Sequence, residues 1–543
     1  MQREAMVDLL KEGTKHLSGL EEAVLKNVEA VRSLSQITKT TFGPQGMKKL
    51  IVNNKGKQYV TSDAAKIITE LEFQHPAANM VINAAKQQQA EIGDFTNLVI
   101  MFAGELMTQA EGLLRMGLHP TIIADGYRTG LKFFNDHCED LVLSTLAGDA
   151  SVSLVEKYLR PVIGAKVPGY SEFFTHLVVE ACHRTLHGYE FNVDNVRVTK
   201  ILGGSVDESE IINGFVLQTT PSGSILEVQD AKVAIYVQGF ELPKTETKGT
   251  VLLKDAEQFK NFSKGEEEML KELVNKLKEQ GVKAVICGGN VQDLALHYCD
   301  RAGIIIVRVG STFDLKRLCR VTGATPFISL TTECDSGNFG MCEKIYVQEI
   351  GSTKCTVFER KESAAVTTIV VRGSTQNILD DIEQAIDDCV CEFKIIEGHK
   401  KFVGGAGAFE IEMSKKISEV GDKCDGLKQY SIKKYAEAFQ MVPRVLAENA
   451  GLDATEVLSE LFVAHQNDIS MGVNVDSNTQ LLNTKQEMVF DNLEAKKNAI
   501  KLATNIATTI LLVDQIVMQK PAGGPKIPQQ RMQGPMDQND AGF

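Results

Sequence analysis

The sequence lacks tryptophan and has only 10 tyrosines among its 543 residues. Platforms of aromatic side chains on which nucleic-acid bases could stack are therefore not expected. It also lacks an excess of basic residues, because 58 lysines and arginines face 71 aspartates and glutamates, for a formal net charge of −13. This acidic balance argues against nucleic acid or an anionic membrane as the main partner.

The sequence has no apolar run of about 18 residues, the length that a membrane-spanning helix needs. Residues 1–10 carry Arg3, Glu4 and Asp8 and have no apolar centre, so they do not resemble a signal peptide. The 11 cysteines are an odd number without any C-x-x-C pair, and Cys389 and Cys391 form a C-x-C. This pattern favours reduced cysteines over a disulfide or zinc framework, and it predicts a cytoplasmic protein without a membrane partner.

A P-loop is also missing, since no G-x-x-x-x-G-K-[ST] spacing occurs. A glycine-rich turn is present instead at residues 41–49 (TFGPQGMKK), between an amphipathic run at 24–37 and an apolar stretch at 50–52. Gly43, Pro44 and Gly46 would leave backbone N–H groups uncrowded, so the turn can hold an anion such as phosphate. The alternative is an ordinary tight turn.

Hydrophobic periodicity divides the chain into helical, mixed and α/β stretches. Residues 1–140 and 409–518 read as mainly helical, and 191–198 alternates like a half-buried strand with a slip at 194–195. Between residues 211 and 365, short β-rich runs alternate with helices, which implies an α/β unit with a partly parallel sheet. The elements expected are helices at 21–37, 75–90, 98–116, 121–141, 266–280, 291–301 and 378–390, and strands at 232–237, 284–287, 304–307 and 367–371.

The order helical, mixed, α/β, mixed, helical indicates a chain that goes out through a linker domain and returns through it. The two helical ends would then build one composite domain, with the α/β part as an insertion. Residues 242–264 read as an exposed excursion, and the tail rich in Pro, Gly and Gln is expected to be disordered. The predicted boundaries are 1–140, 141–210, 211–365, 366–402, 403–519 and 520–543.

Four acidic residues stand at turns or on a helix edge: Asp63, Asp94, Asp388 and Asp491. Each alone could be a helix N-cap or a solvated carboxylate. Asp94 precedes a helix beside Thr96 and Asn97, which suits a role at Mg²⁺ and phosphate. Asp388 lies on a helix in another region and could orient a water for phosphoryl transfer.

The second glycine cluster is Gly404-Gly405-Ala406-Gly407-Ala408, at the head of a predicted helix. Small residues there would let a flat base or a ribose approach the backbone. A flexible linker or close helix packing would produce the same composition.

Taken together, these motifs resemble those of the group II chaperonins over essentially the whole chain. Residues 41–49 resemble the family's T-x-G-P-x-G-M-x-K turn, 61–68 loosely its N-D-G-A-T-I motif, and 93–97 its G-D-G-T-[TN] loop. Arg372-Gly373-Ser374 with the acidic helix that follows, residues 405–410 and residues 449–453 (NAGLD) also match. Within the family, one subunit type of the eukaryotic cytosolic chaperonin is most similar, at residues 72–78 (EFQHPAA), 191–198 (FNVDNVRV), 246–253 (ETKGTVLL), 380–388 and 513–525 (VDQIVMQKPAGGP).

The resemblance implies an ATP-driven protein-folding machine of two stacked rings of paralogous subunits. Each subunit would have a mainly α-helical equatorial domain (1–140 and 403–519), a mixed α/β intermediate domain (141–210 and 366–402) and an α/β apical domain with a helical protrusion (211–365). Nucleotide would bind in the equatorial domain, and unfolded clients of the actin and tubulin type would bind the apical domain. Residues 242–264 would belong to the lid.

The resemblance also implies a role for individual residues in binding ATP or ADP with Mg²⁺. Asp94 would hold Mg²⁺, and Asp388 and Asp63 would orient and activate the water. The nucleotide would contact Phe42, Gly43, Pro44, Phe95, Thr96, Asn97, Gly164, Lys166, Gly405, Gly407 and Asp491, with Lys166 sensing the phosphate.

Three positions depart from the family pattern. Phe95 stands where the family usually has glycine, so its side chain could crowd the phosphates or change the backbone angles. Ala406 replaces the middle glycine of a triplet, which we expect to be a milder change, and Ser62 and Ala64 replace Asn and Gly around Asp63.

Three functions follow as hypotheses. The first is an ATPase subunit whose hydrolysis reorients the domains through the two linker crossings. The second is a structural ring member that binds nucleotide and hydrolyses little of it, which Phe95 favours. The third, a free α/β ATPase acting on a small molecule, has no sequence signature of a compact substrate pocket.

Overall fold

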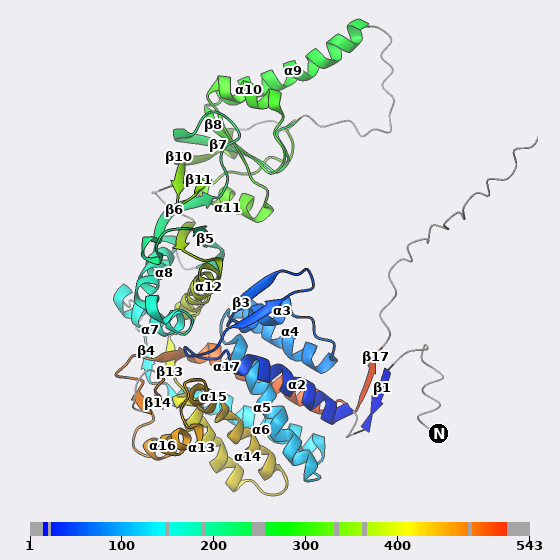
Figure 1. Ribbon diagram of the computed structural model, residues 1–543, viewed down its shortest axis with the longest axis vertical. Helices are drawn as coiled ribbons and strands as arrows, with labels where there is room; N and C mark the ends of the chain where they lie inside the picture. The colour runs from blue at the N-terminus through cyan, green and yellow to red at the C-terminus, as the bar shows by residue number, and fades with distance from the viewer. Residues whose placement is uncertain are drawn as a thin grey trace, which may run out of the picture.

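The computed structural model describes residues 15–19, 23–146, 151–186, 191–241, 256–330, 336–360, 366–475 and 480–518. The molecule is elongated, and three parts follow one another along its long axis (Figure 1). We name them the helical part, the middle part and the distal part. Blue and cyan segments lie beside yellow and red ones in the helical part, so both ends of the sequence contribute to it.

The helical part packs around α5 (Thr96–Arg115), whose sequence is apolar on nearly all sides and is therefore buried. A Cβ on Gly104 of α5 would lie 2.2 Å from the Cβ of Ser35, so this glycine permits the close approach of α2 (Leu25–Lys39). The other helices are α3 (Ala64–Glu70), α4 (Pro76–Glu91), α6 (Pro120–His137), α13 (Ala408–Lys423), α14 (Lys428–Phe439), α15 (Met441–Asn449), α16 (Ala454–Ala464) and α17 (Leu493–Leu511).

Small sheets border the helical part. Strands β16 (Phe490–Asn492), β13 (Lys401–Gly404) and β4 (Ser144–Thr145) form one sheet in that order. Antiparallel pairs are formed by β1 (Lys15–Ser18) with β17 (Gln515–Met518), β2 (Lys49–Val52) with β3 (Gln58–Thr61), and β14 (Met471–Val473) with β15 (Leu481–Asn483).

The middle part has its own apolar core, built mainly by α7 (Val152–Gly164), α8 (Ser171–Thr185) and α12 (Gln376–Gly398) against β5 (Val196–Leu202) and β12 (Thr367–Gly373). Strands β5 and β12 run parallel. They continue through β6 (Glu210–Leu217) into the distal part, in an eight-stranded sheet with the order β5-β12-β6-β11-β10-β7-β8-β9.

The distal part combines parallel and antiparallel strands. Strands β7 (Glu227–Tyr236), β8 (Val282–Cys287) and β9 (Ile305–Arg308) are parallel, whereas β10 (Gly340–Ile350) and β11 (Thr353–Glu359) are antiparallel neighbours. Apolar clusters cover this sheet together with α9 (Ala256–Glu279), α10 (Asp293–Ala302) and α11 (Thr312–Thr322). The helical and partly parallel α/β classes predicted from the sequence are confirmed.

Several predicted elements were wrong in their limits. The strand at 191–198 begins only at Val196, because the Asn192 side chain accepts a hydrogen bond from the Asp194 N–H and folds 193–195 into a 3₁₀ turn. The slip at 194–195 thus marks a turn, one of the two interpretations of that slip. The helix predicted at 121–141 ends at His137 and continues as a 3₁₀ turn to Leu141.

Other limits moved outward. The helix predicted at 378–390 spans Gln376–Gly398, and Ile378, assigned to its apolar stripe, is exposed. The excursion at 242–264 overlaps α9, which begins at Ala256, and residues 242–255 lie outside the described residues, as does the tail 520–543. Arg372 and Gly373, predicted as a turn, are still strand, because β12 pairs with β5 as far as Gly373.

Helix α12 is the element that joins the middle part to the helical part. The Lys48 Nζ lies 2.5 Å from the Asp381 Oδ2, and the Thr61 hydroxyl donates to the Gln384 Oε1 at 3.1 Å. Both contacts attach the β2–β3 region to α12, so this helix brings its own carboxylates to the edge of the helical part. None of the helices in the described residues combines the length and apolar character needed to cross a bilayer.

Candidate functional site at the junction of α5, α7 and α12

The loop at residues 93–95 enters α5 through two left-handed residues. Gly93 has φ 89° and Phe95 has φ 60°, and Phe95 is the N-cap of α5. The Asp94 Oδ1 accepts the Phe95 N–H at 2.5 Å, and the Gln88 side chain donates to the Asp94 carbonyl at 3.0 Å. A Cβ on Gly93 would lie 2.4 Å from the Cys391 Sγ, so the loop is pressed against α12.

Lys166, just beyond the end of α7, is the centre of a cluster of acids. Its Nζ lies 2.6 Å from the Asp388 Oδ2 on α12 and 3.4 Å from the Asp63 Oδ1. Asp63 also caps α3, because its side chain accepts the Lys66 N–H at 3.0 Å. Asp63 is therefore both a helix N-cap and a member of the acidic cluster. The charge of Asp94 acts on both Lys166 and Asp388, so the structure brings all four residues together.

The electrostatics of the cluster combine strong burial with close opposite charges. Burial raises the pKa of Asp388 and of Asp94, and Lys166 lowers both only in part. Burial lowers the pKa of Lys166, but Asp388 and Asp63 outweigh it and the pKa ends above its ordinary value. Lys166 therefore stays charged, while the carboxylates exceed the positive charge available to them.

The glycine-rich segment lies on the other side, where β13 pairs Val403 with Asp491 of β16. The Gly405 N–H donates to the Val489 carbonyl at 3.0 Å, and a Cβ on Gly405 would lie 3.3 Å from the Asp491 Oδ2. Gly407 has φ 83°, and a Cβ there would lie 2.8 Å from the Pro443 Cβ. The segment is thus tightly packed, which argues against a flexible linker and agrees with the alternative of close packing.

Ala406 belongs to the same tight segment and has φ 53°. A left-handed backbone costs a residue with a Cβ about 1–2 kcal/mol, so alanine in place of glycine has a backbone cost here. That it is a milder change than Phe95 stays a prediction. Phe95 and Ala406, which both depart from the family pattern, are thus both held in left-handed conformations.

The turn at residues 41–46 is fixed by two asparagines. The Asn449 side chain donates to the Phe42 carbonyl at 2.8 Å, and the Asn97 side chain donates to the Thr41 Oγ1 at 3.3 Å. Gly43 has φ 82°, and a Cβ there would lie 2.7 Å from the Leu446 Cδ2. Asn97, expected at the phosphates, therefore ties this turn to the start of α5.

Three residues that were predicted to contact the nucleotide contribute less directly to the candidate site. The Thr96 hydroxyl donates to the Gln89 Oε1 at 2.6 Å, so its side chain is already engaged away from the acids. Gly164 ends α7, and a Cβ there would meet only Ser171, at 3.7 Å. Pro44 is half-buried in the turn.

The sequence did not predict several charged residues that pair with the site residues or lie near them. The Lys496 Nζ lies 2.7 Å from the Asp491 Oδ2 and 2.6 Å from the Glu410 Oε1. Glu392 lies near Asp94, Asp388 and Asp491. The only sequence signal for Glu392 was its spacing of four residues from Asp388, which places both on one helix face.

The residues present fit a magnesium–nucleotide complex. Across the described ranges, no three His, Cys, Asp or Glu side chains are already spaced to enclose a metal ion. Mg²⁺ does not need such a cage, because it takes one or two carboxylates together with phosphate oxygens and waters. Asp94, half-buried and close to further carboxylates, supplies a donor of this kind.

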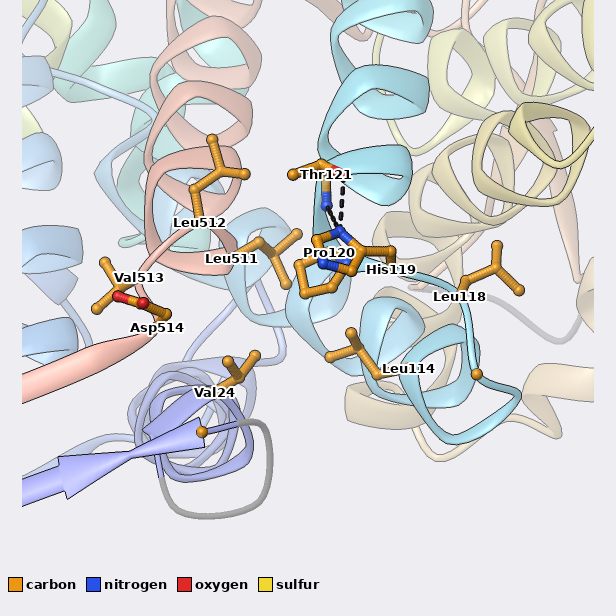
Figure 2. A pocket seen from close by; sticks show the side chains of 12 residues that line it. Val24, Leu114, Leu118, His119, Pro120, Thr121, Leu511, Leu512, Val513 and Asp514 are labelled. Atoms are coloured by element: carbon orange, nitrogen blue, oxygen red, sulfur yellow. Dashed lines mark hydrogen bonds between the residues drawn. The ribbon is translucent and has the colours of Figure 1, made fainter. Parts of the chain in front are cut away.

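A separate hollow of about 350 Å³ lies near the opposite end of α5 (Figure 2). It is lined by Leu114, His119, Leu511 and other mostly apolar residues from the α5–α6 connection and the end of α17. Since α5 has 20 residues, its two ends are about 30 Å apart. This hollow is therefore distinct from the acidic cluster.

An acidic cluster and glycine-rich turns lie together where the returning chain joins the helical part to the middle part. This arrangement defines a chaperonin-like protein. The chain belongs to the TCP-1/cpn60 chaperonin family, whose model matches residues 34–521. It is therefore a chaperonin acting in protein folding, within a family of ATP-dependent proteins.

The similar curated proteins are theta subunits. The chain is 44% identical to T-complex protein 1 subunit theta of Dictyostelium discoideum over 539 residues, which cover 98% of this chain and 99% of that protein. It is 44% identical to the human subunit theta over 536 residues, 98% of each chain. A probable subunit theta of Schizosaccharomyces pombe is 42% identical over 526 residues, 96% of each chain. Theta is the subunit type that the sequence segments pointed to, so that prediction is confirmed.

Proposed function

We propose that this chain binds ATP with Mg²⁺ between the loop at 93–97, the turn at 41–46 and the glycine-rich segment at 404–407, and hydrolyses it there. The observation that carries the proposal is the Lys166 ammonium, paired with Asp388 and Asp63 and facing the charge of Asp94. These residues come from distant parts of the sequence. A cluster of acidic residues with excess negative charge suits a site where a cation and a triphosphate bind together.

The binding roles follow from the surroundings of each residue. Asp94 is the carboxylate that would hold Mg²⁺, which when bound neutralises the charge of the phosphates. Phe42, Gly43 and Pro44 would line the nucleotide, and Phe95, Thr96 and Asn97 would lie at the phosphates, where α5 begins and its N–H groups favour an anion. Gly164 would leave room beside Lys166. Gly405 and Gly407 would face the ribose, with Asp491 near the sugar or base.

In hydrolysis, the oxygen of a water forms a bond to the γ-phosphorus while the bond from that phosphorus to the leaving ADP oxygen breaks. Asp388 would orient this water and accept its proton, because its burial makes it a stronger base than an exposed aspartate. Asp63 would help to orient the water. Lys166 would exchange a carboxylate partner for the phosphate, which transmits the state of the nucleotide to α7 and α12.

The domain layout belongs to the same proposal. Residues 1–140 and 403–519 would form the equatorial domain, 141–210 and 366–402 the intermediate domain, and 211–365 the apical domain with its protrusion. Hydrolysis would reorient the domains and close the chamber of a double ring that this chain builds with paralogous chaperonin subunits. Similar proteins are named as subunits, which supports this assembly. A cytoplasmic location and unfolded clients of the actin and tubulin type belong to the same proposal.

The second candidate function is a ring subunit that binds nucleotide but hydrolyses little of it. The left-handed Phe95 next to Asp94 favours it, since this side chain stands at the phosphate loop.

The test is ATP turnover by assembled complexes that carry Asp388→Ala in this chain alone. Lower turnover is expected if this chain hydrolyses ATP, because the proton acceptor is lost. Glu397→Ala is the matched control, because Glu397 is exposed on the same helix. Unchanged turnover in the Asp388 variant would favour the structural role.

A further inference from the structure

Glu392 is a buried carboxyl group for which the proposed hydrolysis has no use. It lies one turn beyond Asp388 on α12, on the same face, and is 3% exposed. Its Oε2 is buried without a hydrogen-bond partner among the described residues. Buried polar atoms are nearly always hydrogen-bonded, so an unpartnered carboxylate oxygen points to a ligand that completes it.

The charges that act on Glu392 from the described residues are of its own sign. After burial, the carboxylates of Asp94, Asp491 and Asp388 raise the pKa of Glu392. Three neighbouring acids each have a lysine partner, since Asp388 and Asp63 share Lys166 and Asp491 pairs with Lys496. Within the described part of the chain, Asp94 and Glu392 are the acids of this group that form no ion pair with a lysine or arginine.

Two unbalanced carboxylates beside a nucleotide site match the chemistry of a divalent cation. Mg²⁺ takes one or two carboxylates plus phosphate oxygens and waters. We propose that Glu392 is a second acidic anchor, beside Asp94, for the divalent cation that accompanies the nucleotide. This inference rests on the proposed nucleotide site and adds to it a residue that the motifs of the sequence did not include. The phosphates complete the donor set, because the described side chains alone enclose no metal ion.

The experiment measures ADP binding by the purified full-length chain, by calorimetry, in a Mg²⁺ titration and in EDTA. ADP avoids turnover, so the readout is independent of hydrolysis. The variant is Glu392→Gln, which keeps the shape of the side chain and removes its charge, and Glu392→Asp is the conservative variant. Glu397→Gln, on the exposed side of α12, is the matched control.

We expect Glu392→Gln to need about tenfold more Mg²⁺ for the same ADP binding, the order found when groups supporting a metal are removed. Binding in EDTA should be unchanged, Glu392→Asp should recover part of the Mg²⁺ dependence, and Glu397→Gln should match the unaltered chain.

Two results would overturn the inference while leaving the nucleotide site in place. One is a Mg²⁺ dependence in Glu392→Gln equal to that of the unaltered chain, which would make Glu392 a structural acid. The other is an equal loss of ADP binding with Mg²⁺ and in EDTA, which would reflect damage to the pocket. An unaltered chain that binds no ADP in either condition would contradict the proposed function itself, and the anchor with it.

Discussion

Removal of Lys496 should destabilise the helical part strongly, because this lysine is the cation paired with the buried Glu410 carboxylate. Its side chain is 3% exposed and that of Glu410 is 2% exposed, and their charged atoms are 2.6 Å apart. The second Glu410 oxygen has no hydrogen-bond partner among the described residues. Lys496→Met therefore leaves a buried, uncompensated charge, which costs about 3–5 kcal/mol.

A double-mutant cycle can assign this loss of stability to the pair of Lys496 and Glu410. Replacing a whole buried ion pair by apolar side chains is often neutral, so Lys496→Met with Glu410→Leu should recover most of the loss. The assay is urea unfolding of the full-length chain, followed through hydrogen exchange of α17 and α13. Lys501→Met, at an exposed position of α17, is the control and should change little.

The reasoning fails if Lys496→Met unfolds at the same urea concentration as the unaltered chain. It fails equally if the double variant is less stable than Lys496→Met, because the pair would then not act as a unit.

Two further predictions concern Glu412 and Phe95. A hydrogen bond with His465 holds the pKa of Glu412 below its ordinary value, so its stabilising effect is present above about pH 4.5 and disappears as the pH falls further. The difference in free energy of unfolding between the unaltered chain and Glu412→Gln should therefore shrink below that pH, and a difference that persists at pH 3 would contradict this origin. Phe95→Gly should remove the strain of a left-handed backbone, about 1–2 kcal/mol, and lose the packing of a half-buried ring. Because these two effects oppose each other, the stability should stay nearly unchanged. The ATP turnover should rise. Turnover that stays constant or falls would show that the ring does not crowd the phosphates.

Helices with strong apolar periodicity and clear end signals could be predicted from the sequence. Helix α4 begins at Pro76 with His75 as its cap, at the start of the predicted range 75–90. The predicted ends of an element were wrong where a local side-chain contact competed with the periodic pattern, as in the Asn192 turn before β5. Strands β6, β10 and β11 were not predicted. Strand β6 pairs with β11, far away in the sequence, so no local signal marks that pairing. Strands β10 and β11 form a tight hairpin with Ile350 opposite Thr353, and this local signal was missed.

The candidate site was predictable where backbone shape requires particular residues. Gly43, Gly93 and Gly407 stand at positive φ or against a neighbour that leaves no room for a Cβ, so their spacing carried the signal. The supporting charges carried little signal, because Lys496 lies within an ordinary helical pattern and Glu392 is marked only by its spacing of four residues from Asp388. Their role emerges only when α17, α12 and the glycine-rich segment are folded together.

The central claim is that Asp94 and Asp388, which both act on Lys166, serve one magnesium–nucleotide complex. The most direct measurement is a cryo-electron microscopy map of the assembled complex with ADP, Mg²⁺ and aluminium fluoride. The account predicts a cation in contact with Asp94 and the phosphate analogue between Lys166 and Asp388 in this chain. A nucleotide bound elsewhere in the chain, or a site without nucleotide while neighbouring subunits are filled, would contradict it.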